Sequence, residues 1–393
     1  MHRVYMDHIA GTPVHPDVME AMLPFLKDSF GNPQNMHSFG QAALQGLDKA
    51  RAQVAALIHA DPSEIYFTSS GSESNNFALK GLVWANRKKG NHFVVSAIEH
   101  MSILNTVKAL AREGYTSTVV PVDKWGQVDP EEVRKAIKPE TTVVSIMLAN
   151  SEVGTIEPIT QIAGICNERG VVFHSDGVAA VGVVPVDVQA LGVQALSLAG
   201  NQFYGPRGSA ALYVRKGTKI LPLIDGGIQE NGKRAGSENT AGIVGMGQAA
   251  ELAQQNMDER IARIRPLRDR IIQHLSLEMD HVVLTGHPKK RLPYHASFCV
   301  AFVEGEALLL SLDMQGVAVS SGSACSSKSL KASHVLLAMD VDIALAQGSL
   351  VFSLIESLTE KDVQHFLEVF PPIIDRLRKM SPLYTEYLEE KGK

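Results

Sequence analysis

Cysteine is scarce in this chain of 393 residues, and its three positions, Cys166, Cys299 and Cys325, are odd in number and far apart. This pattern argues against a disulfide framework and favours a reducing cytoplasm as the location. The sequence also lacks an apolar run long enough to span a bilayer, and its first residues lack the apolar core of a signal peptide. We therefore expect a cytoplasmic protein with no membrane partner.

Neither sign of charge dominates the sequence. There are 37 Lys and Arg residues against 42 Asp and Glu, which gives a net charge of −5, and both signs are interspersed. Without a basic patch, a nucleic-acid partner is not expected. The chain is longer than a single hydrophobic core usually fills, so we expect one large and one smaller domain.

Short strand-like runs alternate with helical segments through the first two thirds of the chain. The runs cover residues 64–69, 93–96, 115–120, 142–147, 171–175 and 210–214. This alternation predicts an α/β fold with a mostly parallel sheet covered on both faces.

A long charged helix is predicted over residues 257–275, where Pro266 should kink or divide it. We place the domain boundary just before this helix. The large domain would cover residues 15–255. A smaller α+β domain would combine residues 1–14 with 256–393.

Several short motifs stand in a characteristic order along nearly the whole chain. They are Phe30-Gly31-Asn32-Pro33, residues 68–76, Glu99-His100, Glu152-Val153-Gly154-Thr155, Tyr204-Gly205-Pro206-Arg207-Gly208, Gly226-Gly227 and Ser320-Ser321-Gly322-Ser323-Ala324-Cys325. In this order they resemble the NifS/IscS-type cysteine desulfurases of the class V aminotransferase family. The resemblance implies a fold-type I transferase that uses pyridoxal phosphate (PLP), and a homodimer with active sites near the subunit interface.

Ser70-Gly71-Ser72 lie where a predicted strand leads into a helix. Backbone N–H groups and the helix dipole favour a phosphate there, but serine is also an ordinary helix cap, and both interpretations stay open. The resemblance implies that His100 stacks on the PLP ring and that Asp176 pairs with its pyridine nitrogen. It also implies that Asn150 lies near the ring and that Ser237 binds the phosphate across the dimer.

The position that carries the PLP lysine in the family is Gln202 in this chain. An amide nitrogen is delocalised into its carbonyl and cannot form the Schiff base. Other family pocket residues are also replaced; the changed positions are Ser151, Ala179, Ala199, Asn201 and Glu356. Glu356 stands where an arginine would bind the substrate carboxylate, and it should repel that group. These changes predict a divergent member whose PLP binding is non-covalent and weakened.

Cys325 lies in a stretch of small and polar residues, 320–328, which is typical of an exposed loop. A thiol there can accept a persulfide or bind iron as a thiolate. A buried and inert cysteine is a better interpretation for Cys166 and Cys299. We therefore predict Cys325 and His100 as catalytic residues, and Cys325 also as the ligand of an iron–sulfur cluster.

The main hypothesis is an impaired homologue, a pseudoenzyme of sulfur trafficking and iron–sulfur cluster assembly. It would act through Cys325 as persulfide acceptor, cluster ligand or scaffold, with a scaffold or sulfur-acceptor protein as partner. The first alternative is an active cysteine desulfurase that uses non-covalently bound PLP. The second is a class V PLP enzyme with another substrate, which Glu356 suggests.

Overall fold

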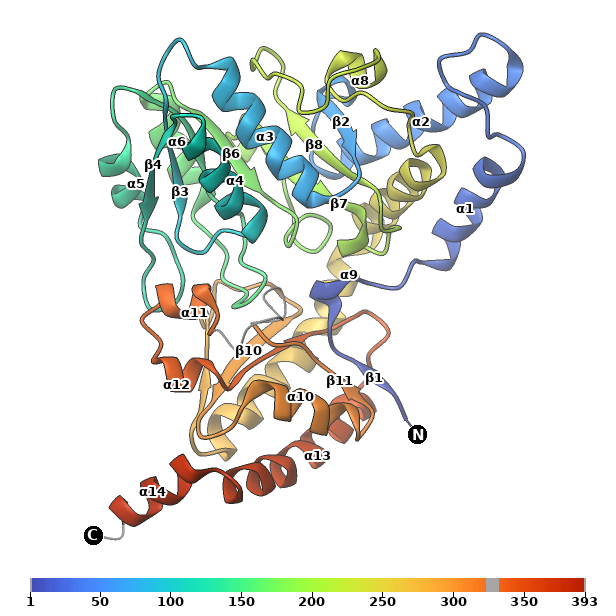
Figure 1. Cartoon of the computed structure of the whole chain (residues 1–393). Coiled ribbons are helices and arrows are strands. Elements are labelled where there is room, and N and C mark those ends of the chain that lie inside the picture. Colours follow the sequence, from blue (N-terminus) through green and yellow to red (C-terminus); the bar gives the residue numbers. More distant parts are fainter. Residues whose placement is uncertain (1, 323–331, 392–393) are drawn as a thin grey trace.

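A seven-stranded sheet forms the centre of the larger part of the molecule, seen here in a computed structural model that describes residues 2–322 and 332–391 (Figure 1). The strand order is β2-β8-β7-β6-β5-β3-β4. Neighbouring strands are parallel except β8, which runs antiparallel to β7 and to β2. The predicted α/β class with a mostly parallel sheet is therefore confirmed.

Nearly all residues of the central strands are buried, as expected when helices cover both faces of a parallel sheet. The strands of this sheet are β2 (Ile65–Thr68), β3 (His92–Ser96), β4 (Thr116–Val120), β5 (Thr141–Ser145), β6 (Val172–Asp176), β7 (Ala195–Ala199) and β8 (Ala210–Val214). The strand-like runs predicted from the sequence do not include β7.

A smaller antiparallel sheet, with the order β12-β10-β9, lies in the lower part of Figure 1, beside a parallel pair formed by β1 and β11. These strands are β1 (Val4–Tyr5), β9 (Val282–Leu284), β10 (His295–Val300), β11 (Val317–Ala318) and β12 (Ser349–Ser353). The N-terminal strand β1 thus pairs with a strand more than 300 residues away.

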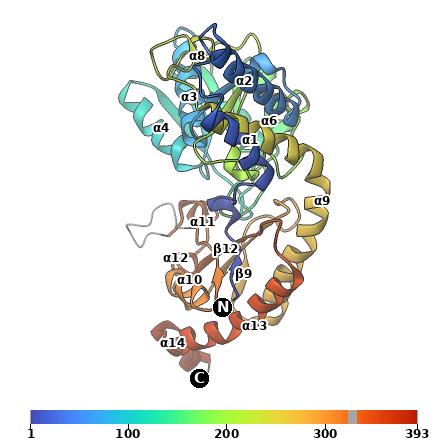
Figure 2. The same ribbon diagram turned by 90° about the vertical axis from the view of Figure 1, so that its right-hand side faces the viewer.

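The longest helix, α9 (Thr240–Glu278), runs down one side of the molecule from the large sheet to the small one (Figure 2). It contains Pro266 without a division, so the predicted division is wrong. Packing of α9 against α1 and α2 at one end and α13 at the other offsets the lost hydrogen bond. The predicted boundary at residue 255 falls inside this helix, and the division into domains stays a prediction.

The other helices are shorter than α9. They are α1 (Pro16–Lys27), α2 (Ser38–Leu57), α3 (Gly71–Ala85), α4 (Met101–Arg112), α5 (Pro130–Ala136), α6 (Ile159–Glu168), α7 (Val188–Leu191), α8 (Gln229–Gly232), α10 (Gly305–Asp313), α11 (His334–Ala338), α12 (Ile343–Ala346), α13 (Glu360–Lys379) and α14 (Pro382–Lys391). Within residues 2–322 and 332–391, no helix is both long and apolar enough to cross a membrane.

Six strands of the large sheet end at the same edge. β3, β4, β5, β6 and β7 are mutually parallel, and β2 points the same way because both β2 and β7 are antiparallel to β8. In open α/β sheets ligands bind outside the carboxyl ends of the strands, so this edge is where a site is expected.

Candidate functional site

The carboxyl edge of the large sheet gathers the site residues predicted from β-strand ends. They are Ser70 after β2, His100 after β3, Asn150 after β5, Asp176 at the end of β6 and Gln202 after β7. Ser237 is the exception, because it lies exposed in the segment that leads to α9. The fold thus explains why residues more than 130 positions apart can serve one site.

Asp176 is a buried carboxylate at the end of β6. Its Oδ1 accepts a hydrogen bond from the N–H of Val178 at 3.0 Å, and its Oδ2 accepts one from Asn75 Nδ2 at 2.6 Å. Burial raises the pKa of Asp176, while these bonds and the nearby His100 oppose the rise. A cation placed beside this carboxylate would therefore be stabilised.

His100 is the N-cap residue of α4. Its Nδ1 accepts a hydrogen bond from the backbone N–H of Ser102 at 3.1 Å and lies 2.8 Å from the Ser102 hydroxyl. The cap fixes the ring at the carboxyl edge, where His100 contributes to the wall of a cavity.

This cavity has a volume of about 130 Å³ and lies between the carboxyl edge of the large sheet and the smaller part of the molecule. His100 and Asn150 line one side, and Ser320, Ser321 and Gly322 line the other. The latter residues begin the stretch that carries Cys325. Cys325 itself lies outside the described residues, so its predicted catalytic and metal-binding roles stay predictions.

The Asn150 side chain organises the turn that follows β5. Its Oδ1 accepts bonds from the N–H groups of Glu152 at 2.8 Å and Val153 at 3.0 Å, and its Nδ2 donates to the carbonyl of Ile98 at 3.0 Å. These contacts connect the turn to the end of β3. The predicted contact of Asn150 with the PLP ring stays a prediction.

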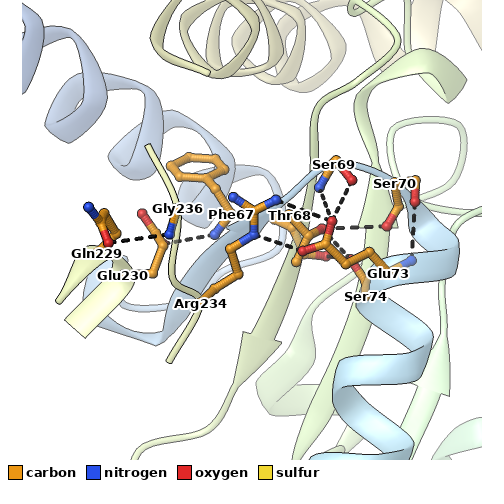
Figure 3. Close-up of polar contacts among 11 residues, drawn as sticks. Phe67, Thr68, Ser69, Ser70, Glu73, Ser74, Gln229, Glu230, Arg234 and Gly236 are labelled. Atoms are coloured by element: carbon orange, nitrogen blue, oxygen red, sulfur yellow. Dashed lines mark hydrogen bonds and ion pairs between the residues drawn. The ribbon is translucent and has the colours of Figure 1, made fainter. Parts of the chain in front are cut away.

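The start of α3 carries both a cap and a buried charge (Figure 3). The Ser70 hydroxyl accepts a bond from the Glu73 N–H at 3.1 Å, so Ser70 makes the cap contact expected of an N-terminal serine. The Glu73 carboxylate pairs with Arg234 at 2.8 Å and accepts the N–H of Ser69 at 2.9 Å. Burial alone would raise the pKa of Glu73, but Arg234 and Ser69 outweigh it and the net shift is downward. Ser72, in the first turn of α3, is exposed.

A second carboxylate fixes the segment around α8 to β2, on the left of Figure 3. Glu230 accepts two bonds from Arg51, at 2.7 and 2.8 Å, and one from the N–H of Phe67 at 2.8 Å. Together with the Arg234–Glu73 pair, these bonds position the backbone that leads to Ser237.

Gln202 is buried and uses its side chain to hold the N-terminal segment. Its Nε2 donates to the carbonyl of Ile9 at 2.9 Å, and the backbone carbonyl of Gln202 lies 2.9 Å from His8 Nε2. Burial lowers the pKa of His8 to about 4, so His8 is neutral at physiological pH. The amide therefore has a structural contact in place of the reactive amine of the family.

Glu356 forms an ion pair with Arg260, with Oε2 and Nε 2.6 Å apart. The Arg260 guanidinium also lies over the Tyr204 ring, 4.9 Å from its centroid. The sequence predicts that Glu356 repels a substrate carboxylate. Arg260 offsets its charge, a contact that could not be predicted because the partners are 96 positions apart.

The remaining altered positions are also part of the packing. The carbonyl of Ala179 accepts a bond from the Tyr294 hydroxyl at 2.9 Å, and the carbonyl of Ser151 lies 2.9 Å from His295 Nε2. Ala199 is the buried last residue of β7, and Asn201 follows it in a 3-10 helix, Gly200–Gln202.

Cys166 in α6 and Cys299 in β10 are buried, and burial raises the pKa of each thiol to about 12. Both are therefore inert toward sulfur chemistry at neutral pH, as predicted.

Comparison with known proteins agrees with this arrangement. Residues 4–366 match the family model of class V aminotransferases. The cysteine desulfurase IscS of Dictyoglomus turgidum is 48% identical over 384 residues, which cover 98% of each chain. The chain belongs to the class V aminotransferase family.

Solved structures of this family extend the likeness to three dimensions. A NifS-like protein has 35% identity and a TM-score of 0.89, with 96% of this chain and 99% of that chain covered. SspA in complex with cysteine has 33% identity and a TM-score of 0.78, with 89% and 98% covered. The fold is therefore that of the fold-type I PLP transferases, and the resemblance to NifS/IscS-type desulfurases is confirmed.

Family membership implies PLP as the cofactor, and the residues present fit it in part. The buried Asp176 carboxylate suits a protonated pyridine nitrogen, His100 lines the cavity at the same edge, and the N–H groups at the start of α3 suit a phosphate. Gln202 does not fit the covalent link, because its amide is bonded to Ile9 and is not nucleophilic.

Proposed function

We propose that this protein is a cysteine desulfurase that holds PLP without a covalent link. The observation that carries the proposal is the buried Asp176 carboxylate at the carboxyl edge. It accepts hydrogen bonds from Asn75 and Val178 and lies close to His100. The relatives named cysteine desulfurase, at 48% identity over nearly the full chain, favour activity over the pseudoenzyme hypothesis. The solved structure of SspA with cysteine favours cysteine as substrate.

When bound, PLP would supply an electron sink for bond cleavage in an amino acid. Asp176 would keep a proton on the pyridine nitrogen, and the Nε2–H of His100 would face the ring. Ser70 and Ser72 at the start of α3 would hold the phosphate by helix dipole and hydroxyl contacts. Gln202 cannot move protons, so we expect a slower reaction than an active-site lysine would support.

The sulfur acceptor in this proposal is the thiol of Cys325. A bond forms between the Cys325 sulfur and the substrate sulfur while the substrate carbon–sulfur bond breaks. The electron pair of that bond stays with the carbon, which takes up a proton, so cysteine becomes alanine and Cys325 becomes a persulfide. A sulfur-acceptor or iron–sulfur scaffold protein would then receive the sulfur.

Alanine formation and PLP absorbance test the proposal on the purified full chain, with cysteine and with or without added PLP. We expect alanine to form only when PLP is present. After borohydride reduction the intact mass of the wild-type chain should be unchanged, because no lysine at position 202 holds the cofactor. A Cys325→Ala variant should bind PLP normally but fail to carry a persulfide. Absence of PLP-dependent alanine would refute the proposal.

A second candidate is the impaired homologue that acts as a sulfur acceptor or scaffold through Cys325. It is favoured by the contacts of Gln202 with Ile9 and Glu356 with Arg260, since the replaced residues have roles in packing. Incubation with an active desulfurase and cysteine would test it. Persulfide on Cys325, without alanine formed by this chain alone, is the expected result.

We also infer a cytoplasmic homodimer. The exposed apolar side chains of α1 and the segment after it support an interface there: Met19, Leu23, Leu26 and Phe30 are 47–67% exposed. Sedimentation of the full chain tests this inference, and a monomer at micromolar concentration would contradict it.

A further inference from the structure

Two side chains outside the predicted site connect Asp176 with His100. Asn75 in α3 donates through Nδ2 to Asp176 Oδ2 at 2.6 Å and to Ser102 Oγ at 2.9 Å. Ser102 Oγ in turn lies 2.8 Å from His100 Nδ1. An unbroken row of hydrogen bonds therefore runs from the carboxylate to the imidazole.

The chemistry of these groups fixes the direction of the bonds. An ionised carboxylate only accepts, so the NH₂ group of Asn75 must face Asp176. The second N–H of that group points to Ser102 Oγ, which leaves the serine proton free to be donated to His100 Nδ1. The backbone N–H of Ser102 is directed to the same nitrogen. With two donors on Nδ1, the proton of the neutral ring lies on Nε2.

The opposite orientation of the Asn75 amide would place its oxygen against the Asp176 carboxylate. Asn75 is buried, and its Oδ1 has no hydrogen-bond partner among the described residues. The amide thus leaves its acceptor unused while its donors serve Asp176 and Ser102. The carboxylate is the group in this row that imposes the orientation.

We propose that Asn75 and Ser102 are positioning residues that transmit the ionisation of Asp176 to the hydrogen bonding of His100 Nδ1. The proposal rests on the proposed function, because it assigns both ends of the row to one PLP site. With Asp176 ionised, His100 presents Nε2–H to that site. When Asp176 is neutral and can donate, the Asn75 amide turns, and Ser102 donates to Asn75 instead of to His100.

The ring nitrogens of His100 report this coupling without any cofactor. We would label histidines with nitrogen-15 in the full chain and assign His100 by its loss in His100→Gln. In wild type, the chemical shifts should identify Nδ1 as an acceptor and Nε2 as protonated. Asp176→Asn should move the Nδ1 resonance, because the serine donor is withdrawn.

The decisive comparison repeats Asp176→Asn in a Ser102→Ala background. We expect the Nδ1 response to fall by at least about half, because the Ser102 hydroxyl that links Nδ1 to residue 176 is absent. Ser102→Thr, which keeps the hydroxyl, should restore it. Asn105→Ala, an exposed change in the same helix, is the matched control and should leave the response intact. An equal response in the Ala and wild-type backgrounds would overturn the proposal, since a direct field between Asp176 and His100 would then suffice.

PLP titration separates this inference from the proposed function. Ser102→Ala should weaken PLP binding by about three- to tenfold and Ser102→Thr should recover it, with melting temperatures confirming that each variant folds. If the wild-type chain bound no PLP while the nitrogen resonances behaved as expected, the proposed function would fail and the coupling would stand.

Discussion

The two sides of the candidate site use their polar groups differently. On the side of Asp176 and His100, the side chains are bonded to one another through Asn75 and Ser102. On the other side, the Gln202 side chain donates a hydrogen bond to the Ile9 carbonyl, and Glu356 forms an ion pair with Arg260. We infer that the first side is organised toward a ligand, and we call it the ligand side. The second, called the altered side, is part of the packing. Substitutions on each side should therefore have different consequences.

Gln202→Lys should produce the largest effect, because it restores an amine on the altered side. Intact mass after borohydride reduction should rise by one reduced PLP, and alanine formation should rise by about 100-fold, the usual contribution of a proton-transferring group. Gln254→Lys is a matched control, since Gln254 also donates to a backbone carbonyl but lies exposed on α9. A rate within about threefold of wild type would mean that other changes on this side limit the reaction.

Asp176→Asn changes the ligand side of the site. It removes the charge that would pair with the pyridine nitrogen, so PLP affinity should fall by about 10- to 100-fold, as for a lost hydrogen bond to a charged partner. Equilibrium dialysis of PLP measures this change. Asp258→Asn, an exposed residue of α9, should leave the affinity unchanged. Equal affinities in both variants would contradict the role assigned to Asp176.

The positions of Ser70, His100 and Asp176 at one edge of the sheet could be predicted from the sequence, because each of them follows a strand-like run. Parallel strands bring such ends to one edge regardless of the distance along the chain. The bonds that distinguish the two sides could not be predicted. Asp176 and Asn75 are 101 positions apart, and Arg260 lies 96 positions before Glu356. Periodicity reports which face a residue occupies, but it does not report partners across separate elements.

Glu99 offers a pH test of the ligand side. It directly precedes His100 and is fully buried. It accepts hydrogen bonds from the Ser96 hydroxyl at 2.6 Å and the Met147 N–H at 2.9 Å, and burial raises its pKa to about 8. The folded state therefore retains this proton between the unfolded pKa of about 4.5 and pH 8, and stability falls as pH rises through that window.

Glu99→Gln copies the protonated form and removes the titration. Relative to wild type, its free energy of unfolding should increase by up to about 1.4 kcal/mol for each pH unit between pH 5 and 8. Denaturant unfolding at several pH values measures this slope. Glu113→Gln on the surface serves as control, and a Glu99→Gln curve parallel to wild type would show that Glu99 is ionised in the folded protein.

The Glu356–Arg260 pair provides the smallest expected effect and tests whether the altered side is part of the packing. Both side chains are mostly buried, at 25% and 13% exposure, so a double-mutant cycle of Glu356→Gln and Arg260→Gln should give a coupling energy of about 1 kcal/mol. The Arg134–Glu168 pair, at 2.9 Å on the surface, is the matched comparison and should couple less.

Because Arg260 already offsets the charge of Glu356, Glu356→Gln should change the KM for cysteine by less than about threefold. A much larger fall in KM would mean that Glu356 faces the substrate carboxylate, and would move this residue to the ligand side of the site.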